Sequence, residues 1–232
     1  MRGGIVRYQT AAGWRCEESY LLLRVNGLRL VRAGHGQQAR ALAAAMGLRL
    51  PLHRANLQGA NLQRTNLIGA DLRGANLVGA SLQGAYLFRA YLHGANLKGA
   101  NLFRANLKGA NLQGANLRGV DLLWANLLWA NLRGANLRGA NLYRADLQRT
   151  NLQGAKLQGA KLQWADLRGA DLRGADLREA DLWGAKLRKA NLRDADLGGA
   201  NLEEADLRWA DLEGANLEGV RLYAVKIIEE GS

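Results

Sequence analysis

The chain has 232 residues, with 32 Lys and Arg against 20 Asp and Glu, and it contains one Cys and one Pro. A single cysteine excludes an internal disulfide, and the net charge of +12 excludes a surface that is acidic along its whole length. The N-terminus lacks the apolar stretch and cleavage site of a signal peptide, and no run is long enough to cross a membrane. We therefore expect a cytoplasmic protein without a membrane partner.

The first fifty residues differ in composition from the rest of the chain. Residues 1–34 are expected either to form a β-hairpin over 20–32, with an Asn-Gly pair at its turn, or to be partly disordered. Residues 35–50 are expected to provide a capping helix and an entry strand, since Gln37 to Met46 is rich in Ala. A cap is needed because the first unit of a stacked repeat would otherwise expose its apolar end and its strand edges.

Leucine then recurs at every fifth position from Leu52 to Leu222, which gives 35 leucines in one unbroken register. Ala stands two residues before nearly every one of them, and the residue between is usually Asn or Asp, as in Ala55-Asn56-Leu57. A helix needs apolar residues at a spacing near 3.6, and a long strand needs strict alternation, so a period of five fits neither. The repeating region spans residues 51–228.

The repeat is compatible with a short extended segment followed by a tight corner. In an extended segment Ala and Leu point to one side, while the Asn or Asp between them points to the other. Gly is common at the second corner position, as at Gly59 and Gly74, where a type II turn requires a positive φ. Four units close a square coil of about 20 residues, and such coils stack at about 4.8 Å. The sequence predicts an all-β solenoid of about nine coils, with a tail at 229–232.

This pattern, a small residue, Asn or Asp, Leu, a polar residue and Gly, is similar to the consensus of the pentapeptide-repeat family. The resemblance covers residues 50–228, over three quarters of the chain. It implies a right-handed quadrilateral parallel β-helix, here with a short N-terminal helical cap. It also implies a protein partner, because most characterised relatives bind other proteins, and some protect DNA gyrase by imitating DNA.

Residues 20 apart should be stacked neighbours if each coil holds 20 residues. Lysine in the outward strand position provides an internal check, because each such Lys then meets an Asp in an adjacent coil. We expect each opposite-charge pair to contribute roughly 0.2–1 kcal/mol. An Asn column from Asn76 to Asn136 is likewise expected to form amide ladders. The predicted charge ladder consists of Lys156 with Asp176, Lys161 with Asp181, and Lys186 between Asp166 and Asp206.

No arrangement in the sequence indicates catalysis. His53 and His93 share a column but lie two coils apart, and His35 is isolated, so a shared metal ion is not expected. Asp is plentiful, but most copies occupy the same outward position, where a solvated strand face is the simplest interpretation. We predict that the protein is not an enzyme and uses no cofactor or metal.

Aromatic residues are unevenly distributed over the four sides of the coil, which we name the Leu52, Leu57, Leu62 and Leu67 faces after the first leucine of each. The Leu62 and Leu67 faces and the corners that follow them hold all five Trp of the repeat region. Trp and Arg in adjacent coils are near enough for cation–π contact. The candidate partner-binding residues are Arg64, Phe88, Arg89, Phe103, Arg104, Trp124, Trp129, Tyr143, Arg144, Arg149, Trp164, Trp183 and Trp209.

Two interpretations of this Trp and Arg pattern are open. In the first, the bulky side chains only shield the sheet, and they occupy corners that are not type II turns. In the second, they form a protein-binding face, because exposed Trp, Tyr and Arg are the usual anchors of interfaces. The second interpretation is the one we favour from the sequence.

Charge shows a further asymmetry along the chain. Residues 1–150 hold 20 Lys and Arg against 5 Asp and Glu, whereas residues 151–232 hold 12 against 15. Lys98, Arg118 and Arg138 stack as like charges in three consecutive coils. This stripe indicates an anionic partner, although screening by salt makes the repulsion weak.

Three functions are compatible with these features. The leading hypothesis is a non-catalytic protein–protein interaction scaffold in the bacterial cytoplasm. The alternative is binding of single-stranded nucleic acid or RNA through the basic body, where aromatic rings would stack on bases. Gyrase protection ranks third, because a DNA mimic should be acidic. We expect a monomer or an end-to-end homodimer through the C-terminal coil.

Overall fold

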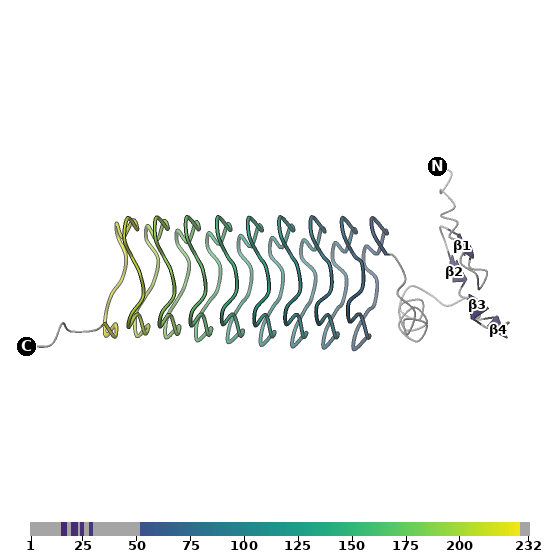
Figure 1. Ribbon diagram of the computed structural model, residues 1–232, viewed down its shortest axis with the longest axis horizontal. Coiled ribbons are helices and arrows are strands. Elements are labelled where there is room, and N and C mark those ends of the chain that lie inside the picture. Colours follow the sequence, from purple (N-terminus) through teal and green to yellow (C-terminus); the bar gives the residue numbers. More distant parts are fainter. Residues whose placement is uncertain (1–14, 18–19, 23, 26–27, 30–51, 228–232) are drawn as a thin grey trace, which may run out of the picture.

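The computed structural model describes residues 52–227 and four short strands near the N-terminus (Figure 1). The strands form two antiparallel pairs, β1 with β2 and β3 with β4. The predicted turn residues between β3 and β4 lie outside the described residues, as do the predicted capping helix within 35–50 and the tail at 229–232. The strand bounds are β1 Arg15–Glu17, β2 Tyr20–Leu22, β3 Arg24–Val25 and β4 Leu28–Arg29.

Residues 52–227 form a rod of stacked coils (Figure 1). Each outward strand residue forms a parallel bridge with the residue 20 positions further on. The N–H of Leu77 donates to the carbonyl of Asn96 at 2.7 Å, and the N–H of Asn96 donates to the carbonyl of Ala75 at 2.9 Å. The coil of 20 residues is therefore confirmed. Each coil has four sides, so the Leu57 face lies opposite the Leu67 face.

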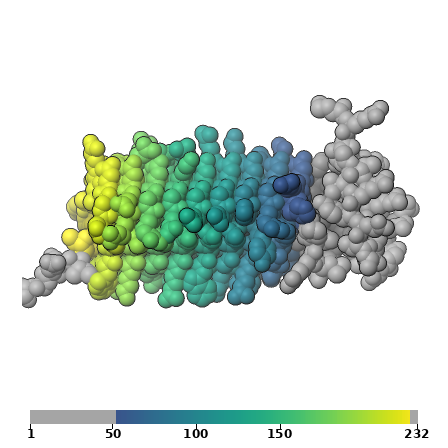
Figure 2. All heavy atoms as spheres, turned by 45° about the horizontal axis from the view of Figure 1, so that its top comes forward, coloured from purple at the N-terminus to yellow at the C-terminus, as the bar shows by residue number. Residues whose placement is uncertain are grey.

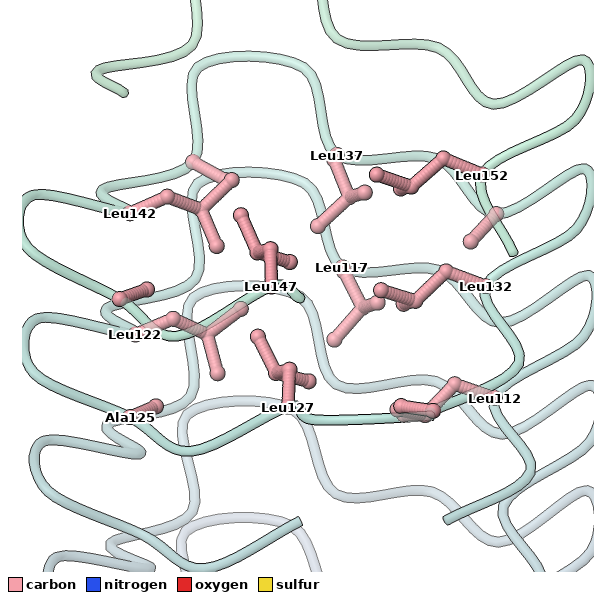
Figure 3. Packing of buried hydrophobic residues seen from close by; sticks show 14 of the residues in the cluster. Leu112, Leu117, Leu122, Ala125, Leu127, Leu132, Leu137, Leu142, Leu147 and Leu152 are labelled. Carbon is pink, nitrogen blue, oxygen red and sulfur yellow. The ribbon is translucent and has the colours of Figure 1, made fainter. Parts of the chain in front are cut away.

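Leucine fills the interior of the rod. Every leucine of the register from Leu62 to Leu207 is at most 5% exposed. Leucines 20 apart stack in columns and point inward, as Leu117 does beneath Leu137 (Figure 3). Burying one such side chain stabilises the fold by roughly 1.5–3 kcal/mol, so the core is a sum of many similar contributions along one axis.

The corners are tight turns, and all of them share one backbone conformation. The N–H of Ala80 donates to the carbonyl of Leu77 at 3.0 Å, and Gly79 between them has a φ of 62°. The expectation that bulky residues occupy a different kind of corner is wrong, because the 15 non-glycine corner residues also have φ between 53° and 60°. The reason is the neighbouring coil: Trp124 still donates its N–H to the carbonyl of Tyr143, at 3.1 Å.

The Asn or Asp of each repeat supports the corner that follows it. Its side-chain oxygen accepts the backbone N–H of the residue two positions later, as between Asn101 and Phe103 at 2.9 Å. This bond satisfies an N–H that no other backbone group reaches, and it is the turn-forming contact typical of these two residue types. The residue after Ala is therefore polar for a structural reason as well as for solubility.

The last coil is less well covered than the others. Leu217 is 41% exposed, Leu222 is 53% exposed and Ile227 is 63% exposed. The surface of the preceding coils is continuous in the space-filling view (Figure 2). Within the described part of the chain, no helix combines the length and apolar character needed to span a membrane.

Replacing a buried leucine in the middle of the rod should be strongly destabilising. We expect Leu127→Ala to lower the free energy of unfolding by about 2–5 kcal/mol, because the stacked neighbours cannot collapse into the cavity. Urea denaturation followed by circular dichroism measures this. Leu222→Ala, at a 53% exposed position, is the control and should cost less than half as much; equal losses would contradict the interior assignment.

Candidate functional site

Bulky corner residues are concentrated on two adjacent edges of the rod. Twelve of the 15 non-glycine corner residues follow the Leu62 or the Leu67 face. The outward strand residues of the Leu67 face lie between these two edges. We call the two edges and the strip between them the Trp/Arg surface. Its non-glycine corner residues are Arg64, Arg89, Arg104, Trp124, Trp129, Arg144, Arg149, Trp164, Lys189, Glu204, Trp209 and Ala224.

The tryptophans of this surface fall into two groups. Trp124 is 46% exposed, and Trp129 and Trp209 are each 53% exposed. Trp164 is different, because its ring covers Gly184 of the next coil and meets Trp183 edge to face at 4.9 Å between ring centroids. The first group therefore offers ring surface to solvent, whereas the second serves mainly to pack the rod.

Cations of the chain lie over most of the exposed rings. The predicted alternation of Arg and Trp along one edge gives a cation–π contact at Arg144 and Trp124, with 5.0 Å between the guanidinium carbon and the ring centroid. Contacts of this kind contribute about 0.5–1 kcal/mol at exposed positions. The remaining contacts within the candidate set are Arg89 with Phe88 at 5.1 Å, Arg104 with Phe103 at 5.0 Å, and Arg144 with Tyr143 at 5.4 Å.

Sequence reasoning missed part of this surface. Lys108 lies 4.8 Å from the ring centroid of Trp129, and Arg188 lies 4.6 Å from that of Trp209. Both pairs are 21 residues apart, so a search at one residue beyond the coil length would have found them. Tyr86 also belongs to the strip between the edges, and it is 52% exposed.

The predicted charge ladder has the expected backbone register but different ion pairs. Lys156 bridges Asp176, Lys161 bridges Asp181, and Lys186 bridges both Asp166 and Asp206. Within residues 52–227, however, no Lys forms an ion pair with these carboxylates. Arg two residues after Asp takes the carboxylate instead, because its planar guanidinium bonds both oxygens in the same coil. The ion pairs are Asp166 with Arg168 at 2.6 Å, Asp176 with Arg178 at 2.8 Å, and Asp206 with Arg208 at 2.8 Å.

These pairs change the acidity of the carboxyl groups. Hydrogen bonds from Arg178 lower the pKa of the Asp176 carboxyl below its ordinary value, and burial opposes this only partly. Arg208 lowers the pKa of Asp206 in the same way. Asp181 has other partners, since it accepts hydrogen bonds from Gln163 at 2.6 Å and from Asn201 at 3.1 Å.

The predicted anion stripe is present on a different side of the rod. Lys98, Arg118 and Arg138 are exposed in consecutive coils beside the Leu57 face. The Asn column on that face forms an amide ladder only at alternate steps, from Asn76 to Asn56 at 3.2 Å and from Asn116 to Asn96 at 3.1 Å. The ladder is interrupted because each Asn oxygen also accepts a backbone N–H.

Metal-binding geometry was not expected from the sequence. In the part of the chain that the structure describes, no group of three His, Cys, Asp or Glu side chains could hold a metal ion. His53 and His93 are both exposed, and His35 lies outside the described residues.

Square coils built from four five-residue units define a solenoid repeat protein. The family model for pentapeptide repeats covers most of the chain, so the chain belongs to the pentapeptide-repeat family. No curated protein sequence shows a significant match. The segments matched by the family model are 52–87, 85–122, 125–163, 155–194 and 190–226.

Several solved structures are similar to this chain. Trypsin-treated QnrB1, a plasmid-mediated fluoroquinolone resistance protein, has a TM-score of 0.57 at 20% identity, covering 71% of this chain and 87% of QnrB1, which shows a shared fold. HetL from the cyanobacterium Nostoc, a pentapeptide repeat protein involved in heterocyst differentiation regulation, is 39% identical, covering 86% of this chain and 99% of HetL with a TM-score of 0.32. Rfr23 from the cyanobacterium Cyanothece is 32% identical, covering 51% and 91% with a TM-score of 0.36.

A methyl group added at Gly184 should test the packing role of Trp164. The added carbon would lie 2.9 Å from the Trp164 ring, whereas at Gly159 it would meet nothing within 4 Å. Both glycines have φ near 60°, so both substitutions to Ala carry the same left-handed strain of about 1–2 kcal/mol. We expect Gly184→Ala to cost a further 1–3 kcal/mol or so in thermal or urea denaturation. Adding Trp164→Gly should remove this difference; a persistent difference would contradict it.

Acid should weaken the fold through the Asp–Arg pairs. The folded-state pKa of Asp171 and of Asp176 is lowered by hydrogen bonds from Arg173 and Arg178, so the stabilisation is present above the unfolded value near 3.9. It is lost as the pH falls through the lowered folded-state pKa. We expect the loss of melting temperature between pH 7 and pH 3 to be smaller in the double variant Asp171→Asn, Asp176→Asn.

Asn suits this comparison because it occupies the same position in neighbouring repeats and keeps the oxygen that accepts the backbone N–H. Differential scanning calorimetry at the two pH values gives the measurement. The same pH-dependent loss in the variant and the unchanged chain would contradict a role for these pairs.

Proposed function

We propose that the protein is a non-catalytic scaffold whose Trp/Arg surface binds a protein partner. The observation that carries this proposal is the placement of Trp124, Trp129 and Trp209. Each is about half exposed at a left-handed corner where glycine is the unstrained residue. Characterised members of the family mostly bind other proteins, which agrees with the proposal.

The energetics of these corners argue against a purely structural role. A non-glycine residue in the left-handed region costs about 1–2 kcal/mol, and an exposed cation–π contact returns about 0.5–1 kcal/mol. Trp129, for example, gains the contact with Lys108 and leaves 53% of its surface in water. Strain at exposed aromatic residues is typical of binding sites, where the partner supplies the missing contacts.

Shielding of the sheet explains Trp164 but not the other tryptophans. Trp164 covers the buried Gly184, as expected of a shielding residue. Trp124 and Trp129 instead lie five residues apart, on the two edges that flank Asn126. Two exposed rings on either side of a flat strip suit a partner that lies across the strip and buries both.

The other two functions receive less support at this surface. Lys108, Arg144 and Arg188 already lie over the rings of the three exposed tryptophans, which leaves less ring area for stacking bases. Imitation of DNA requires acidic groups, whereas residues 52–150 hold 12 Lys and Arg against 3 Asp and Glu. The likeness to QnrB1 concerns the fold alone.

Replacing two tryptophans by glycine should remove binding without unfolding the rod. We expect Trp124→Gly, Trp129→Gly to keep the melting temperature within a few degrees, because relief of left-handed strain offsets the lost cation–π contacts. Partner recovery from a native cell extract should fall, and affinity for the purified partner should drop by at least about 30-fold, as for hot-spot residues.

The matched control is Arg54→Gly, Glu179→Gly, which makes the same kind of change at left-handed corners outside the Trp/Arg surface. This variant should recover the partner as the unchanged chain does. Undiminished recovery by the tryptophan variant would sink the proposal, and so would equal loss in both variants.

A further inference from the structure

A second surface, opposite the Trp/Arg surface, carries only positive charge. It consists of the Leu57 face and the corners on either side of it, between residues 53 and 159, and we call it the Leu57 basic surface. It contains seven Lys and Arg and no Asp or Glu. These cations are Arg54, Arg73, Lys98, Arg118, Arg133, Arg138 and Lys156.

Most of these cations lack a carboxylate partner. Arg73 pairs with Asp71 at 2.7 Å, but none of the other six forms an ion pair within residues 52–227. Lys98, Arg118 and Arg138 are exposed and stand in consecutive coils, which are about 4.8 Å apart. Unit charges at such a distance repel by roughly 1 kcal/mol in water before salt screening. A multivalent anion would relieve this repulsion along the whole stripe.

The uncharged groups of this surface are also arranged to donate. Each Asn oxygen accepts, at 3.3 Å, the backbone N–H of the residue two positions later. Because these oxygens are already engaged, the outward amide groups offer mainly their N–H donors to a partner. The surface is therefore rich in donors and poor in free acceptors. The Asn residues concerned are Asn56, Asn76, Asn96, Asn116 and Asn136.

The edges of the Leu57 basic surface are smooth. A side chain built at Gly79, Gly99 or Gly119 would meet nothing within 4 Å, so a flat partner can approach the backbone at these corners. No Phe, Tyr or Trp belongs to the surface. It therefore lacks both the rings on which unpaired bases stack and the aromatic anchors typical of protein interfaces.

We propose that the Leu57 basic surface binds the phosphate backbone of a nucleic-acid duplex without reading its sequence. Phosphate oxygens are acceptors only, and they carry the charge that these unpaired cations lack. A duplex also presents phosphates at regular intervals, as the coils present cations. This site lies opposite the Trp/Arg surface, so it does not depend on the proposed protein partner.

The salt dependence of binding tests this site quantitatively. The probe is a fluorescently labelled 20-base-pair DNA duplex, used in two unrelated sequences, with binding to the full chain followed by anisotropy. Contact of about five cations with phosphates predicts a slope of log affinity against log salt near −4.5, which is about a 500-fold loss between 50 and 200 mM salt. Both duplexes should bind equally.

Two triple variants of equal charge locate the contact. Lys98→Gln, Arg118→Gln, Arg138→Gln places in the stripe a residue that the same column already contains at Gln58 and Gln158. We expect this variant to reduce the magnitude of the slope by about 2.7. Arg104→Gly, Arg144→Gly, Arg149→Gly removes the same charge from the Trp/Arg surface and should leave the slope unchanged.

Three outcomes would overturn the proposal. The first is no duplex binding at 50 mM salt. The second is an equal loss of slope in both triple variants, which would mean that overall charge alone drives the association. The third is binding to vesicles of anionic phospholipid in the absence of duplex binding, which would assign the surface to a membrane. Partner recovery through the Trp/Arg surface is measured separately, so failure here leaves that proposal intact.

Discussion

The backbone hydrogen bonds between successive coils are the constraint on which the rest of the structure depends. Each repeat donates from its Leu N–H to the next coil and from its outward residue to the previous coil, as Leu77 and Asn96 do. The corner N–H groups bond to the next coil as well. This ladder holds the corners in one conformation whatever residue occupies them, which is why Trp124 and Gly79 have φ of 60° and 62°. Residue identity at a corner is therefore free of the fold and open to function.

The same ladder divides each repeat into fixed and variable positions. Ala and Leu face the interior, and the Asn or Asp supports its own corner through the bond to the following N–H. Only the two corner residues, and in part the polar one, can vary without loss of the core. Because coils repeat every 20 residues, any such variation is projected onto straight columns. A protein of this kind acquires a binding surface by changing columns rather than by shaping a pocket.

Much of this arrangement could be predicted from the sequence, because an interior of identical units leaves a period that nothing else produces. Leu107 and Leu162 are buried as expected, and residues 20 apart pair. What periodicity cannot show is the direction of a long side chain. Lys186 and Asp166 are neighbours in the backbone, yet Asp166 bonds Arg168, because a bidentate guanidinium within one repeat is closer and better shaped than an ammonium one coil away. The diagonal contact of Lys108 with Trp129 escaped for the same reason.

Two opposite columns of one rigid rod differ in chemistry because they differ in what their corners expose. On the Trp/Arg surface, bulky residues stand at strained corners, and cations such as Lys108 and Arg144 lie on rings of the chain itself. On the Leu57 basic surface, glycine corners keep the edge low, and cations such as Arg118 and Arg138 have no partner in the described chain. The first arrangement favours burial of aromatic area, and the second favours regularly spaced anions. Since the coils between them share one packed leucine interior, ligands on the two sides would be held at a fixed separation set by the width of the coil.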